Sequence, residues 1–87
     1  MIAVHLSDAM LAALRGTAEV PDTLLARVNG ARRDGDGVVM TLSEDEAMAM
    51  TEMCQWYIRR DPVTGTLGEQ AKLFDAIVTA IDDAAGA

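Results

Sequence analysis

The chain of 87 residues has little cysteine, histidine or aromatic side chain. Its single cysteine, Cys54, excludes an internal disulfide and is typical of a reducing compartment. Its single histidine, His5, would need an oriented nucleophile or further metal ligands to act in catalysis. No glycine-rich phosphate loop and no nucleophile motif is present. We therefore expect a protein that is not an enzyme and has no cofactor, no metal site and no small-molecule substrate.

Positive charge is also scarce, with seven Lys and Arg against fourteen Asp and Glu, a net charge of −7. Nucleic acids and anionic membrane surfaces bind clustered cations. Arg27, Arg32 and Arg33 form the one basic cluster, so a DNA-binding regulator is the least favoured interpretation. The longest apolar run, 9–14, is too short to cross a bilayer, and the start of the chain has no signal-peptide pattern. We expect a cytoplasmic protein that binds neither nucleic acid nor membranes.

Half of the residues are hydrophobic, which favours a folded chain. The length predicts a single domain over 1–87 with a small core. The three aromatic residues are Trp56, Tyr57 and Phe74, so this core must consist mainly of aliphatic and Met side chains.

One short pattern occurs twice, at 2–8 and at 38–44. Each copy alternates apolar residues with period two and then ends in Leu-Ser-acid, which predicts a strand followed by a capped helix. In the first strand His5 lies on the face opposite to the apolar side chains. In the second strand Val39 and Thr41 lie on that opposite face. The segment 34–37, Asp-Gly-Asp-Gly, predicts the turn that leads into the second strand.

Four helices are expected. The first covers 8–15 and ends at Gly16 in a left-handed conformation, the second starts at Pro21, the third covers 44–60, and the last runs from about 67 to 84. The Ser43–Glu46 and Thr66–Glu69 spacings match capping boxes. Three interpretations of 29–37 stay open: a helix stop at Asn29-Gly30, a helix that continues to Arg33, or a hairpin turn at Asn29-Gly30. The apolar spacing before Asn29 favours helix.

The expected fold class is therefore α+β, predominantly helical, with the order β-α-α-β-α-α and a two-stranded ribbon. Two strands alone make a marginal sheet. The ribbon is for that reason a candidate to extend across a homodimer, in which edge strands pair about a two-fold axis.

The helix over 44–60 has an apolar arc that is wider than one core requires. Either neighbouring helices flank it on two sides, or Met53 and Trp56 form an association surface, since Trp and Met are common at interfaces. We predict a small non-enzymatic protein–protein interaction module whose partner is a second copy of the chain. The predicted contact residues are Ala49, Met53, Trp56, His5, Val39 and Thr41.

The acidic residues suggest an alternative function. A regulator or inhibitor could place them in a basic site of a nucleic-acid-binding protein or of an enzyme. The residues that would carry this function are Glu44, Asp45, Glu46, Asp82 and Asp83. Binding of this kind should weaken with salt, whereas an apolar dimer should not.

Overall fold

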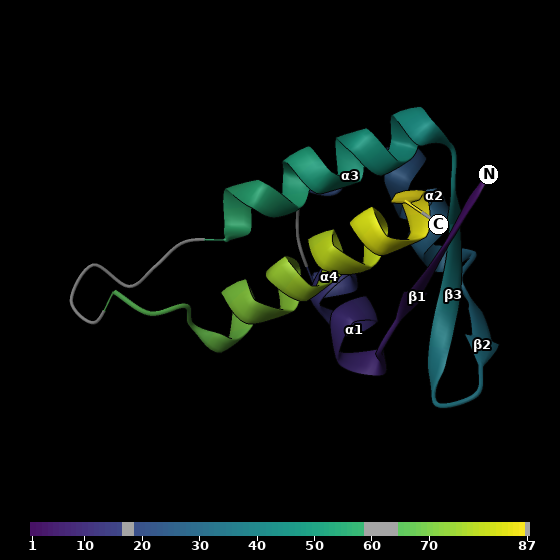
Figure 1. Ribbon diagram of the computed structural model, residues 1–87. Helices are drawn as coiled ribbons and strands as arrows, with labels where there is room; N and C mark the ends of the chain where they lie inside the picture. Colours follow the sequence, from purple (N-terminus) through teal and green to yellow (C-terminus); the bar gives the residue numbers. More distant parts are fainter. Residues whose placement is uncertain (17–18, 59–64, 87) are drawn as a thin grey trace.

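The computed structural model describes residues 1–16, 19–58 and 65–86. Its elements are β1 (Ile2–Leu6), α1 (Asp8–Gly16), α2 (Asp22–Asn29), β2 (Arg32–Asp34), β3 (Gly37–Leu42), α3 (Glu44–Tyr57) and α4 (Glu69–Gly86) (Figure 1). This confirms an α+β fold with four helices. The third helix was expected to run to about residue 60, but α3 ends at Tyr57. Residues 59–64, where the expected end lies, are outside the described part.

The predicted two-stranded ribbon was wrong, because the sheet has three antiparallel strands in the order β1-β3-β2. In the central strand β3, Val39 faces His5 of β1 on one side and Arg32 of β2 on the other. The three residues of β2 are charged and exposed, so no apolar alternation marks this strand in the sequence. It forms because the turn after Asp34 returns the chain along β3.

Of the three interpretations of 29–37, the helix stop is right. The Gly30 amide donates a hydrogen bond of 3.0 Å to the Ala26 carbonyl and closes α2. The turn predicted at 34–37 connects β2 to β3, with Gly35 at a φ of +59°, a conformation that glycine adopts without steric cost. A Cβ atom on Gly37 would collide with the Leu6 backbone carbonyl, so this turn also needs glycine at its end.

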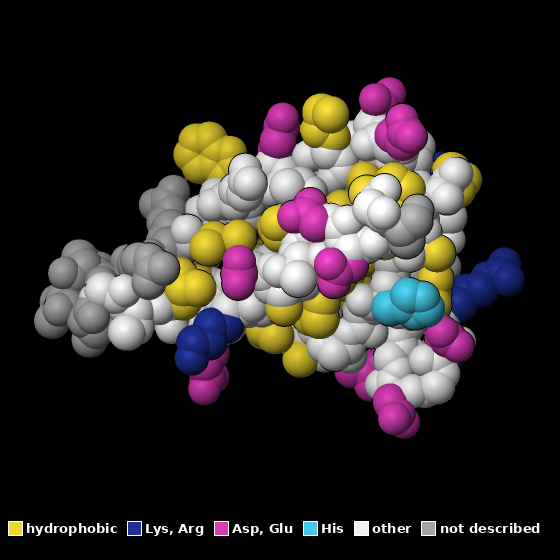
Figure 2. Space-filling model, in the orientation of Figure 1, with side chains coloured by type: hydrophobic (Ala, Val, Ile, Leu, Met, Phe, Trp, Pro, Cys, Tyr) yellow, Lys and Arg dark blue, Asp and Glu magenta, His cyan; other side chains and the backbone are white. Residues whose placement is uncertain are grey.

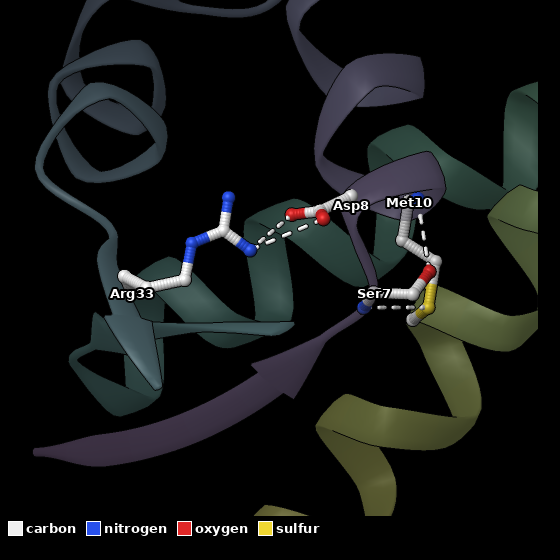
Figure 3. Close-up of polar contacts among 4 residues, drawn as sticks. All are labelled: Ser7, Asp8, Met10 and Arg33. Carbon is white, nitrogen blue, oxygen red and sulfur yellow. Dashed lines mark hydrogen bonds and ion pairs between the residues drawn. The ribbon is translucent and has the colours of Figure 1, made fainter. Parts of the chain in front are cut away.

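Side chains cap two of the helices. Ser43 and Glu46 form the predicted capping box, in which the Ser43 hydroxyl accepts a hydrogen bond of 3.1 Å from the Glu46 amide and the Glu46 carboxylate accepts one of 2.8 Å from the Ser43 amide. At the start of α1 the Met10 amide donates to the Ser7 hydroxyl, and the Ser7 amide donates to the Met10 sulfur (Figure 3).

Two predicted helix ends differ from the structure. Helix α4 begins at Glu69, and the Gly68 carbonyl accepts the first helical hydrogen bond from Lys72, so Thr66 is not its cap. Gly16 ends α1 without the expected left-handed conformation.

The helices cover one face of the sheet, and the core lies between them (Figure 1). Helix α4 contacts both α1 and α3 as well as β1, so α4 is the central helix. The interpretation of 44–60 as a helix enclosed on two sides was therefore wrong, and α3 keeps Trp56 71% exposed. None of the helices in the described part of the chain combines the length and hydropathy that a membrane-spanning segment requires.

Candidate interaction surfaces

The structure divides the six predicted contact residues between two surfaces. Ala49, Met53 and Trp56 lie along one side of α3 at helical spacing, and Trp56 is in its last turn. That end of α3 points away from the sheet (Figure 1). His5, Val39 and Thr41 lie on the more exposed face of the sheet, opposite to the face that packs on the core. The sequence assigned both sets to one protein contact, but they form two separate patches.

The first surface, which we call the Trp56 patch, consists of Ala49, Met53, Trp56 and the neighbouring Pro21 and Tyr57. Trp56 is exposed, Met53 is half-buried, and an open groove of about 340 Å³ runs along them. Tyr57 stacks on the buried Phe74, with ring centroids 4.8 Å apart, which ties the floor of the groove to the core. The charged side chain that lines this groove is Glu19. The patch is therefore an apolar surface on a rigid support.

The open face of the sheet is more polar than the sequence suggested. The His5 Nδ1 atom lies 3.5 Å from the Asp34 carboxylate, and both side chains are well exposed. Arg32 stands next to Val39 on the same face. Because the sequence did not reveal β2, it missed the two charged residues that β2 adds around Val39.

The predicted basic cluster is not brought together as a patch. The Arg27 Nε atom donates a hydrogen bond of 2.9 Å to Glu46, and Arg33 donates bonds of 2.8 and 3.1 Å to the two oxygens of Asp8 (Figure 3). Arg32 and Arg33 are successive strand residues and therefore point to opposite faces of the sheet. The cation of each paired arginine faces a carboxylate of its own chain.

The predicted acidic residues are also divided. The Ser43 amide and the Arg27 guanidinium both bind the Glu46 carboxylate, and these contacts lower the pKa of Glu46. Glu46 is thus engaged in an internal contact. Glu44 and Asp82, by contrast, line one groove between α3 and α4, with Ile2 at its end.

This α3–α4 groove has a volume of about 390 Å³. Its floor contains the buried Ala47 and Ile81, and Met48, 65% exposed, stands at its rim. Sequence reasoning missed Met48 and Glu52 as members of this surface. The i, i+4 spacing of Glu44, Met48 and Glu52 was the signal that could have identified them.

Cys54 and His5 lie in different environments. Cys54 is enclosed in the core, and burial raises the pKa of its thiol to about 12, so it is protonated at neutral pH. His5 stands on the open sheet face, where it cannot reach that thiol. In the described ranges, no three His, Cys, Asp or Glu side chains come close enough together to hold a metal ion.

Comparison of the chain with models of protein families, with curated proteins and with solved structures gave no match.

Proposed function

We propose that this protein is a small non-enzymatic protein–protein interaction module that self-associates through the Trp56 patch. The observation that carries the proposal is the indole of Trp56, which remains 71% exposed although it is the largest apolar side chain in the sequence. Tryptophan is the residue type most enriched at the energetic centres of interfaces. The half-buried Met53 beside it supplies an adaptable apolar neighbour.

The charge distribution favours a second copy as the partner. A two-fold contact brings the same surface of each protomer face to face. The groove of the Trp56 patch has one carboxylate, that of Glu19, at its edge, so two such patches can meet with little repulsion. Two α3–α4 grooves in the same arrangement would oppose Glu44, Glu52 and Asp82 to their own copies.

This proposal keeps Ala49, Met53 and Trp56 as contact residues and leaves His5, Val39 and Thr41 outside the contact. Arg32 and Asp34 flank the latter group, and a dry contact there would have to remove their charges from water. The open sheet face is thus the less favourable of the two surfaces for self-association.

Sedimentation equilibrium of the purified protein tests the proposal. We expect a monomer–dimer equilibrium that strengthens or stays constant as salt rises, since screening reduces repulsion between two chains of net charge −7. A protein that stays monomeric up to about 1 mM, the weak end of specific affinity, would contradict self-association.

A further inference from the structure

We infer that the α3–α4 groove binds a segment of another protein that combines an apolar anchor with flanking Lys or Arg residues. The groove lies on a different side of α3 from the Trp56 patch and closer to the start of that helix. The inference therefore does not depend on self-association.

The size and the apolar floor of the groove are the reason to expect an apolar anchor in the partner segment. Its volume of about 390 Å³ falls within the range of ligand-binding pockets, roughly 300–1,000 Å³. The buried Ile81 and Ala47 form an apolar floor, to which the half-buried Ile2 contributes from β1. Met48 stands 65% exposed at the rim, and its unbranched side chain can adapt to an incoming apolar group.

The acidic rim of the groove is the reason to expect Lys or Arg residues in the partner segment, beside its apolar anchor. The charged residues that line the groove are Glu44, Glu52 and Asp82, all acidic and all exposed. Within the described part of the chain, none of these three carboxylates has a hydrogen bond or an ion pair, in contrast to Glu46 and Asp8. Figure 2 shows acidic side chains spread over this face with apolar side chains between them, and Lys and Arg side chains at its margins.

The spacing of these carboxylates distinguishes a peptide from a metal ion. No triple of acidic side chains in the described ranges converges closely enough to chelate a cation. Carboxylates that are spread around an apolar floor instead match cations that are spread along a chain. Helix-in-groove recognition has this form, with apolar anchors in the groove and charged residues at its edges.

Fluorescence anisotropy with three labelled helical peptides tests the inference. One peptide has a Leu face and a Lys face, the second replaces Lys with Glu, and the third replaces Leu with Ser. We expect saturable binding of the Leu–Lys peptide alone, which weakens as NaCl is raised because the rim charges are exposed. Binding of the Leu–Glu peptide with equal affinity, or no saturable binding of the Leu–Lys peptide up to about 1 mM, would overturn the inference.

Matched charge variants locate the contact. Glu52→Gln with Asp82→Asn should weaken binding by roughly twofold to thirtyfold, the range expected when two exposed ion pairs are lost. Asp22→Asn with Asp36→Asn removes the same charge outside the groove and should leave the affinity unchanged. Equal losses in the two double variants would show attraction to the net charge alone and would overturn the site.

Backbone NMR of the wild-type protein separates the two proposals. Addition of the Leu–Lys peptide should shift the amide signals of Met48, Thr51 and Ile81 and spare those of Met53 and Trp56. Shifts that centre on Trp56 would place the peptide on the other patch. Shifts of the groove signals with protein concentration alone would make a second copy the occupant. Either result would overturn the inference, and neither depends on whether the Trp56 patch dimerises.

Discussion

Replacement of Trp56 by Ser should abolish self-association without unfolding the protein. An indole side chain has roughly 200 Å² of surface. Covering the 71% of Trp56 that is exposed would remove about 140 Å² from water, which corresponds to about 3.5 kcal/mol per protomer. Part of this free energy offsets the loss of translational and rotational freedom. A dimer held chiefly by two such indoles is therefore weak, and it depends strongly on them.

The loss for an energetically central residue is at least about 2 kcal/mol per copy. Because Trp56 contributes twice to a two-fold contact, Trp56→Ser should weaken the dimer at least about a thousandfold. Sedimentation equilibrium measures this change directly. Trp56 is also the single tryptophan of the chain, so its emission should shift to shorter wavelength as the wild-type concentration rises.

Met48→Ser is the matched control, since it removes another exposed apolar side chain from α3 outside the Trp56 patch. It should leave the dimer unchanged, and the unfolding free energy of both variants should stay within about 0.5 kcal/mol of wild type because both positions are exposed. Dimerisation of Trp56→Ser with wild-type affinity would contradict a contact through the Trp56 patch. Equal disruption of the dimer by Met48→Ser would contradict it as well.

Three further predictions concern stability. Ser43→Ala removes the capping box with Glu46 and should cost about 1 kcal/mol in urea unfolding; an unchanged midpoint would show that this cap contributes nothing. Gly37→Ala places a Cβ against the Leu6 carbonyl and should cost about 1–3 kcal/mol, which a wild-type melting temperature would contradict. Burial raises the pKa of the Cys54 thiol to about 12, whereas an unfolded thiol loses its proton near pH 8.5. Above that pH the unfolded state binds fewer protons than the native state, so stability should fall with rising pH by up to about 1.4 kcal/mol per unit. Cys54→Ala should lack this part of the slope, and parallel pH profiles of the two proteins would disprove the burial of the thiol.

Local patterns were sufficient to predict much of this fold. The alternation in β1 and β3, the Ser43–Glu46 capping box and the apolar stripe of α4 are properties of neighbouring residues, and each appears in the structure. Cys54 lies four positions after Met50, and the two side chains are buried on the same side of α3, as helical periodicity requires.

The candidate surfaces were only partly predictable. The exposure of Trp56 was one of two interpretations of an apolar arc too wide for one core, and the structure agrees with that one. The α3–α4 groove was not predicted, because Glu52 and Asp82 lie in different helices and come together through packing between distant segments.

The sequence by itself determined where β1, β3 and the four helices form, since those preferences depend on side chains a few positions apart. Only the tertiary structure decided that Arg32–Asp34 is a strand, because this charged segment has no apolar pattern and acquires its conformation by pairing with β3. The tertiary structure also decided that α4, and not α3, is the central helix. The sequence of a helix shows how wide its apolar arc is. Which neighbouring element covers that arc depends on how the whole chain packs.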